Sequence, residues 1–182
     1  LNILPTLKDN SVDFCITDPP YNIGQKGNNK LTKMGDKIVE NSKAFGWDYM
    51  DNYFEWVESW MTQLHRVVKH SAFIFFDLNE IGKLKEIGEK VGFYAKTFFC
   101  IVKNNPLPHF CKNGYRSGFE LGILFLKDKK NSKFNFLKQD EMINVKNYTI
   151  GNKLTKHPTE KPIEVIKHLV RVMSDEGDCG LD

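Results

Sequence analysis

A strand that ends in two prolines constrains the fold of this chain more than any other feature. Residues 12–17 are mostly apolar and predict one buried β-strand. They are followed directly by Asp18, Pro19, Pro20 and Tyr21. Each proline fixes its own φ and carries no N–H group, so carbonyls near the turn stay free to accept hydrogen bonds from a ligand. The sequence therefore places a carboxylate and an aromatic ring at the carboxyl end of a strand, where open α/β sheets bind their ligands.

The two functional side chains of this turn suit one kind of ligand. The Asp18 carboxylate can accept hydrogen bonds from an amine, and the Tyr21 ring can stack on a flat heterocycle. An amino group on a planar ring would satisfy both. An ordinary turn at the end of a strand also uses Asp and Pro, so the motif alone leaves both interpretations open.

The spacing of apolar residues further along the chain predicts an α/β domain. Apolar side chains recur at helical intervals over residues 51–69 and 79–91, and again after Pro162, which we place in the first turn of a final helix. The strand–helix–strand–helix start is typical of a doubly wound, mainly parallel sheet. The last two strands have no helix between them, so we expect antiparallel neighbours and an antiparallel edge. Besides residues 12–17, short apolar runs predict strands at 71–77, 95–103 and 119–127.

Two segments carry a local excess of lysine. Residues 22–46 are polar and glycine-bearing without a clear period, which predicts a long mobile loop that includes five lysines. Residues 128–156 are basic, and we expect them to be irregular. Such positive charge can attract a polyanion, although a solvated lysine-rich surface would have the same composition.

Composition narrows the class of protein. A length of 182 residues with 41% hydrophobic and 27% charged residues fits one globular domain, and a net charge of +3 is too small for a polycation. The four cysteines form no Cys-x-x-Cys pair, so we expect no metal site and a reducing compartment. No apolar run approaches the length of a membrane span, and no signal peptide is visible. We therefore expect a cytoplasmic protein whose start, Leu1, is trimmed or processed.

A second motif precedes the final helix. Thr159 is well placed to cap the helix that Pro162 opens. A helix amino terminus with His157 and Lys161 nearby would suit a carboxylate or another anion. A capped start of a helix with surface charges explains the same residues without any ligand. The motif consists of His157, Pro158, Thr159, Glu160, Lys161 and Pro162.

Together, and in this order, the two motifs resemble those of the amino-methylating DNA methyltransferases of the permuted β class. The helix that ends at residues 64–69 before a strand at 72–76, and the Phe-Glu-Leu run at 119–121, are also similar to that family. The resemblance covers nearly the whole chain. It implies a Rossmann-like sheet and methyl transfer from S-adenosylmethionine to an exocyclic amine of a DNA base. It also identifies residues 128–156 as a target-recognition segment.

The resemblance assigns roles that agree with the chemistry of the side chains. Asp18 and the carbonyl of Pro19 would accept from the two hydrogens of the amine and stabilise the charge that grows on its nitrogen. Tyr21 would stack on a base that has left the duplex. Asp at the first motif position is typical of the adenine-modifying members, and methylation of a cytosine amine is the alternative.

The residues implied by the resemblance form three groups, with double-stranded DNA as the partner. A homodimer and a cognate restriction endonuclease are further expected partners. The catalytic group is Asp18, Pro19, Pro20 and Tyr21. The cofactor group is Asp18, Pro19, His157, Pro158, Thr159, Lys161 and Asp182. The DNA-contacting group is Asn22, Lys26, Lys30, Tyr115, Arg116, Lys129 and Lys130.

The chain departs from the family pattern at its end. Residues 177–182 resemble the approach to the family's glycine-rich cofactor turn, with Asp182 as its aspartate, and the elements of the cofactor lobe that follow that turn are absent from these 182 residues. Either the chain is one part of a longer enzyme, which we favour because the catalytic residues are intact, or it is a non-catalytic DNA-binding remnant.

Overall fold

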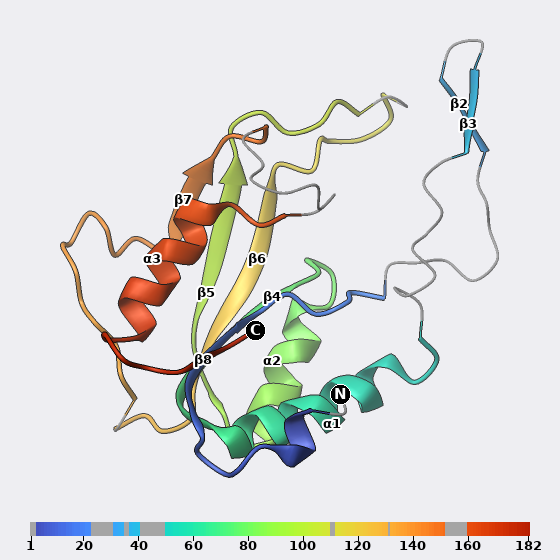
Figure 1. The fold of residues 1–182 in the computed structure, drawn as a ribbon. Helices are drawn as coiled ribbons and strands as arrows, with labels where there is room; N and C mark the ends of the chain where they lie inside the picture. The colour runs from blue at the N-terminus through green and yellow to red at the C-terminus, as the bar shows by residue number, and fades with distance from the viewer. Residues whose placement is uncertain are drawn as a thin grey trace.

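The computed structural model contains one mixed six-stranded sheet, three α-helices and a separate two-stranded hairpin in its described residues (Figure 1). It describes residues 3–22, 50–109, 112–130, 132–151 and 160–182, and the backbone of 31–34 and 37–40. The elements are a 3-10 helix at Leu4–Thr6, β1 Val12–Thr17, β2 Leu31–Met34, β3 Lys37–Glu40, α1 Tyr53–Val67, β4 Val68–Phe76, α2 Ile81–Lys90, β5 Tyr94–Lys103, β6 Phe119–Leu126, β7 Val145–Tyr148, α3 Ile163–Met173 and β8 Gly180–Leu181.

The strand order of the large sheet is β7-β5-β6-β4-β1-β8. Strand β1 pairs in parallel with β4 and with β8, and β5 pairs in parallel with β7. Strand β6 is antiparallel to both of its neighbours, β4 and β5. The predicted antiparallel pairing of the last two predicted strands is confirmed. The predicted antiparallel edge is wrong. The reversed strand β6 lies inside the sheet between β4 and β5, and the outermost pair on that side, β5 and β7, is parallel.

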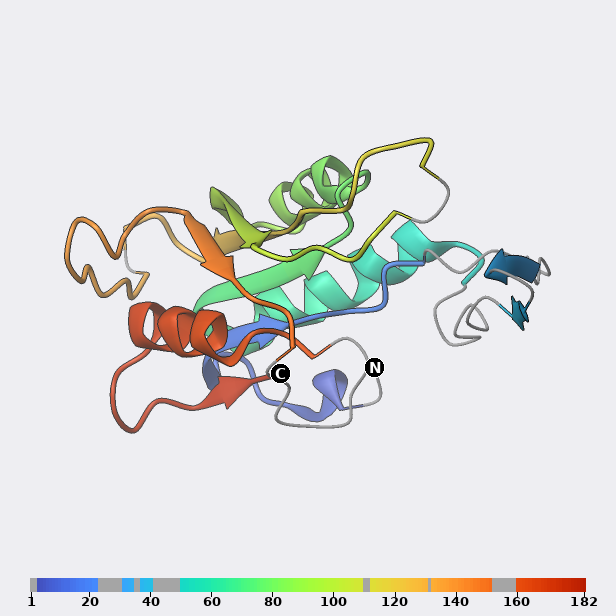
Figure 2. The ribbon, with the colours of Figure 1, turned by 90° about the horizontal axis from the view of Figure 1, so that it is seen from above.

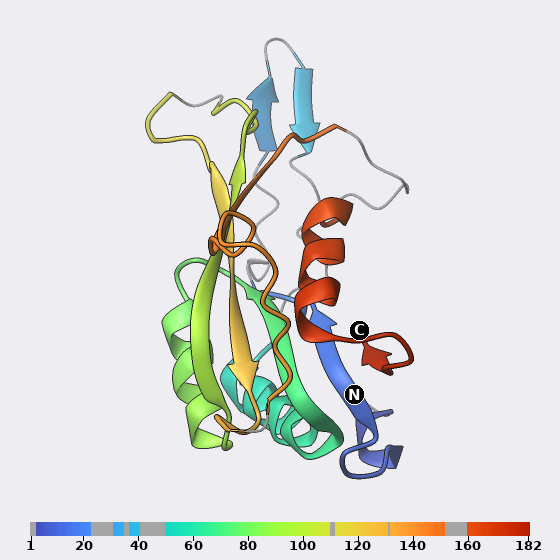
Figure 3. The same cartoon turned by 90° about the vertical axis from the view of Figure 1, so that its left-hand side faces the viewer.

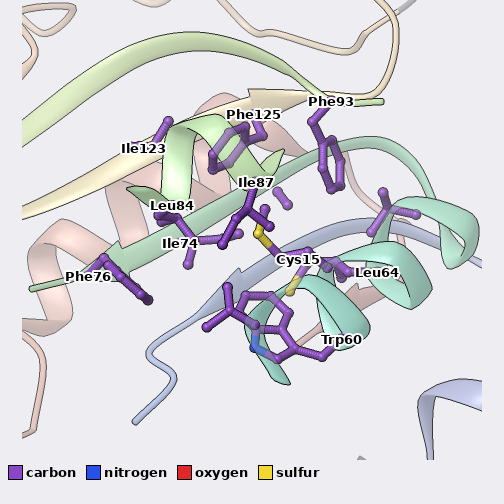
Figure 4. Packing of buried hydrophobic residues seen from close by; sticks show 14 of the residues in the cluster. Cys15, Trp60, Leu64, Ile74, Phe76, Leu84, Ile87, Phe93, Ile123 and Phe125 are labelled. Carbon is purple, nitrogen blue, oxygen red and sulfur yellow. The ribbon is translucent and has the colours of Figure 1, made fainter. Parts of the chain in front are cut away.

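Helices cover both faces of the sheet, which confirms the doubly wound architecture. Helices α1 and α2 lie on one face and α3 on the other (Figures 2 and 3). On the first face, Trp60 and Leu64 of α1 and Leu84 of α2 pack with Ile74 and Phe125 of the sheet (Figure 4). On the second face, α3 buries Val165, Leu169 and Met173 in a cluster with Phe14, Ile16, Phe73 and Phe75.

The first helix and the strand after it meet without a loop. Helix α1 ends at Val67 and β4 begins at Val68, whereas the sequence predicted a helix to residue 69 and a strand from 71. Both valines are fully buried. The Lys127 ammonium donates to the carbonyl of Val68 at 2.8 Å, and the Arg66 guanidinium donates to the carbonyls of Leu4 and Leu7 at 2.9 and 2.8 Å. Lys127 thus satisfies a backbone carbonyl where the chain turns directly from helix to strand, and Arg66 ties the end of α1 to the segment before β1.

Two segments predicted to be irregular contain regular structure. Within the predicted loop 22–46, β2 and β3 pair as an antiparallel hairpin, and apart from Asn22 the rest of that loop lies outside the described residues. Within the basic segment 128–156, residues 145–148 form β7. Asn135 fixes the earlier part of this segment. Its backbone N–H donates to the carbonyl of Val172 at 2.7 Å, and its side-chain amide donates to the carbonyl of Ser174 at 2.8 Å. Both segments were missed because short strands without an apolar run give no periodic signal.

Strand β8 is held to β1 by charged groups as well as by backbone pairing. The Asp13 carboxylate accepts from the N–H of Cys179 at 2.8 Å and pairs with the Lys69 ammonium at 2.8 Å. Asp178 pairs with Lys133 at 2.6 Å. Because Cys15 is paired with Leu181, Asp182 lies beside the last residues of β1. None of the helices in the described part of the chain is long and apolar enough to cross a membrane.

We expect Gly122→Ala to destabilise the protein. A Cβ at this β6 position would lie 2.5 Å from the ring of Phe73, which is fully buried and cannot move away. Such overpacking costs about 2 kcal/mol, which for a domain of this size lowers Tm by roughly 4–8 °C.

Gly82→Ala in α2 is the matched control, because a Cβ there meets no atom within 4 Å. Replacing a helical glycine by alanine stabilises by about 1 kcal/mol, so Tm should rise by roughly 2–4 °C. Thermal unfolding followed by circular dichroism measures both changes. Equal Tm values for the two variants would contradict the packing of β6 against Phe73.

Candidate active site

The turn after β1 lies at the carboxyl edge of the parallel strands. Thr17 pairs with Ile74 of β4, so Asp18 emerges beside the last residues of that strand. The Tyr53 hydroxyl, from the first residue of α1, donates to the carbonyl of Pro20 at 2.6 Å. The Tyr53 ring stacks on Phe76 at 6.1 Å between centroids. Tyr53 therefore fixes the turn against Phe76. Its hydroxyl also uses the carbonyl of Pro20, one of the carbonyls that the sequence predicted to be free for a ligand.

A second contact ties the turn to the start of α1. Asn22 has a left-handed backbone with φ of 58°, and its side-chain oxygen accepts from the N–H of Met50 at 2.7 Å. Asn22, predicted to contact DNA, thus has a structural contact. Together with the Tyr53 bond, it holds residues 20–22 close to residues 50–53.

The structure brings the two sequence motifs together around Asp18. The Tyr21 hydroxyl donates to one oxygen of the Asp18 carboxylate. The Lys161 ammonium, from the second motif, lies 3.1 Å from the other oxygen and donates to the Tyr21 hydroxyl at 3.2 Å. Burial, followed by the charge of Asp18, raises the pKa of Tyr21, so its hydroxyl stays protonated as a donor.

Three residues that the sequence did not assign to the site form ion pairs or hydrogen bonds within it. Glu120 on β6 pairs with Lys161 at 3.0 Å and with Lys103 on β5 at 2.9 Å. The Tyr148 hydroxyl on β7 donates to Glu120 at 3.4 Å. Burial would raise the pKa of Glu120, but Lys161 and Lys103 hold it below its usual value. Burial and the charge of Glu120 raise the pKa of Tyr148 to about 12.

No sequence pattern links these three residues, because they lie on different strands. Glu120 stood out only as part of the Phe-Glu-Leu run at 119–121. Only the order of β7, β5 and β6 in the sheet places Tyr148, Lys103 and Glu120 next to one another.

The predicted DNA-contacting residues fall at two opposite edges of the sheet. Tyr115 is fully exposed in the β5–β6 connection, at the edge that carries Asp18. The Arg116 guanidinium next to it donates to the carbonyls of Pro106 and Leu107. Lys129 and Lys130 follow the end of β6 at the other edge, roughly 20 Å from Asp18 given about 3.3 Å per strand residue. The Lys129 ammonium lies 4.2 Å above the Tyr94 ring.

The remaining predicted site residues are placed as follows. Asp182 directly follows β8, the strand next to β1, and so lies at the same edge of the sheet as Asp18. His157, Pro158, Thr159, Lys26 and Lys30 lie outside the described residues. Cys15 on β1 is the cysteine nearest in sequence to this turn, and burial raises its pKa to about 12, so its thiol stays protonated.

Comparison with known proteins gives a consistent result. The family model for N6/N4 methylases, described as DNA methylase, matches residues 12–182. Type II methyltransferase M.HpaI of Haemophilus parainfluenzae is 26% identical over 202 residues, an alignment that covers 100% of this chain and 60% of that protein. This chain therefore spans less than two thirds of the length of that relative.

Solved structures show the same fold. The crystal structure of the M1.HpyAVI–SAM complex matches with a TM-score of 0.64 at 22% identity, over 100% of this chain and 73% of that one. The PvuII DNA methyltransferase, described as cytosine-N4-specific, matches with a TM-score of 0.69 at 15% identity, over 96% and 68% of the two chains.

We expect Glu120 to stabilise the folded protein at neutral pH and to lose this contribution in acid. Its folded-state pKa lies below the usual 4.5, so its contribution is present above that value and is lost as pH falls through the folded-state pKa. Glu120→Gln should therefore lower Tm at pH 7, and the difference from the unsubstituted protein should shrink at pH 4 and below.

Glu58→Gln is the control, because the Glu58–Lys90 pair lies on the exposed surfaces of α1 and α2. Its Tm should differ little from that of the unsubstituted protein at either pH. Calorimetric scans across the pH series measure both variants. A Tm difference for Glu120→Gln that is constant with pH would contradict the ion pairs of Glu120.

Proposed function

The chain belongs to the N6/N4 DNA methylase family, and we propose that it carries the catalytic centre of an S-adenosylmethionine-dependent DNA adenine methyltransferase. The observation that supports this most is the Asp18 turn. It lies at the carboxyl end of β1, is fixed by Tyr53, and presents a carboxylate beside the Tyr21 ring. A weakly nucleophilic aryl amine requires such an acceptor.

Asp18 supplies the chemistry that the amine lacks. The lone pair of an exocyclic amine is delocalised into the base, so hydrogen bonds from the amine to Asp18 and to the carbonyl of Pro19 would localise it on nitrogen. The carboxylate would also stabilise the positive charge that develops on that nitrogen. The amine cannot reach this turn from inside a duplex, so the base must be extruded, with Tyr21 as the ring on which it stacks.

The described residues fit one side of an S-adenosylmethionine site. Strands β1 and β8 are parallel neighbours and end at one edge, where Asp18 and Asp182 place two carboxylates. Carboxylates suit the positively charged groups of this cofactor, which supplies the methyl group when bound. We propose His157, Pro158, Thr159 and Lys161 as further contacts, on the basis of the second motif.

The target is proposed to be adenine because Asp stands first in the motif. Methylation of a cytosine amine is the second candidate, since a cytosine-N4-specific enzyme shares the fold. Double-stranded DNA is the proposed partner, in the cytoplasm. A homodimer and a cognate restriction endonuclease stay predictions.

We expect purified protein, in the form its gene encodes, to transfer a tritiated methyl group from S-adenosylmethionine to duplex DNA. Asp18→Ala should lower the rate by at least about 100-fold, the scale found when a group that stabilises developing charge is removed. Digestion of the product to nucleosides and chromatography then show whether the label is on adenine or on cytosine.

Glu86→Ala, on the exposed surface of α2, is the control and should keep full activity. Tritium found on the cytosine amine would show that cytosine, not adenine, is the target. Binding of DNA without any methyl transfer or cofactor binding would favour a non-catalytic DNA-binding remnant.

We expect Tyr115→Ala to weaken DNA binding more than the double change Lys129→Ala with Lys130→Ala. Tyr115 projects from the edge that carries Asp18, and base–aromatic stacking is worth about 1–3 kcal/mol, a roughly 5- to 150-fold change in Kd. The two lysines lie at the far edge. Fluorescence anisotropy with labelled duplexes at fixed salt measures the three Kd values. A larger loss for the lysine pair would place DNA at the other edge.

A further inference from the structure

The Lys161 ammonium lies between two carboxylates. Its nitrogen is 3.1 Å from Asp18 and 3.0 Å from Glu120, and it donates to the Tyr21 hydroxyl at 3.2 Å. An ammonium has three N–H donors, so these three oxygens match its full capacity. The side chain is only 14% exposed. The rings of Phe75 and Tyr21 lie 5.0 and 5.4 Å from the nitrogen, which leaves little room for water around the charge.

Glu120 is itself held in place from the side away from Asp18. Its second oxygen pairs with Lys103 at 2.9 Å and accepts from Tyr148 at 3.4 Å. The resulting row of charges alternates in sign through Asp18, Lys161, Glu120 and Lys103. Because Lys103 balances Glu120 and Lys161 balances Asp18, the row as a whole is neutral.

Asp18 can accept a hydrogen bond from a ligand only if Lys161 is shared with Glu120. One of its oxygens accepts from Tyr21 and the other faces Lys161. An incoming amine needs the same carboxylate. An ammonium with no second counter-ion would stay on Asp18 and compete with the amine, because a charge-assisted bond is about twice as strong as a neutral one.

We propose that Glu120 is a positioning residue that holds the Lys161 ammonium so that the Asp18 carboxylate remains available to the amine of the target base. This role rests on the proposed methyl transfer. Glu120 acts through Lys161. Among the described residues, the titratable groups that contact this row are Tyr21 from the β1 turn and Tyr148 from β7.

Glu120→Gln tests the proposal by steady-state kinetics. Gln keeps the size of the side chain but loses the charge that retains Lys161. We expect kcat to fall on the order of 100-fold, the scale of a misplaced reacting group, while KM for DNA changes little. Glu120→Asp keeps the charge and should recover part of kcat. Glu58→Gln, which removes a surface ion pair, should leave kcat unchanged.

A double-mutant cycle separates positioning from simple loss of structure. If Glu120 acts through Lys161, then Glu120→Gln should have little further effect on kcat in the Lys161→Met background. Additive effects of the two substitutions, or a kcat for Glu120→Gln equal to that of Glu58→Gln, would overturn the proposal and leave the methyltransferase function standing.

A titration that needs no activity checks the ion pair itself. In protein with ¹³C-labelled glutamate, Lys161→Met should raise the pKa of Glu120 from its lowered position, because an opposite charge at 3.0 Å is lost. Lys90→Met should leave Glu120 unaffected. An unchanged Glu120 titration in Lys161→Met would overturn the inference. An unsubstituted protein that transfers no methyl group would instead overturn the proposed function, and the positioning role with it.

Discussion

The burial of β4 on both of its faces is the constraint on which the rest of the structure depends. Every residue from Ser71 to Phe76 is at most 2% exposed. Alternate side chains of a strand point to opposite faces, so a strand that is apolar throughout needs a hydrophobic layer on each side. Helices α1 and α2 supply one layer and α3 the other. The doubly wound architecture follows from this requirement.

That architecture decides where polar chemistry can occur. Both faces of the sheet are covered, so charged groups meet at its edges. At the carboxyl edge, side chains from β5, β6, the β1 turn and the segment before α3 form the row of alternating charges around Asp18. Each charge has a partner of opposite sign, which offsets the cost of partial burial. The same edge carries the exposed Tyr115, whereas Lys129 and Lys130 lie at the other.

The parts of the fold that could be predicted are those with a periodic apolar pattern or with prolines that end an element. The apolar runs of β1, β4, β5 and β6, the amphipathic faces of α1, α2 and α3, and the prolines after Thr17 all gave correct elements. The parts that were missed have no such signal. Strand β7 has four residues, two of them polar, and its position is fixed only by pairing with β5. The interior place of β6 is fixed by its pairing with β4 on one side and β5 on the other, which the strand pattern alone does not encode.

The candidate site divides in the same way. The sequence by itself determined the Asp-Pro-Pro-Tyr turn at the end of a strand, because proline geometry and strand patterning are local properties. It also singled out Lys161 as a site residue. Only the tertiary structure decided that Lys161 reaches Asp18, that Glu120 and Lys103 balance its charge, and that Tyr53 fixes the turn from behind. These contacts join residues that are 33 to 143 positions apart or lie on separate strands. The distance between such residues is set by strand order and helix packing, which no local pattern encodes.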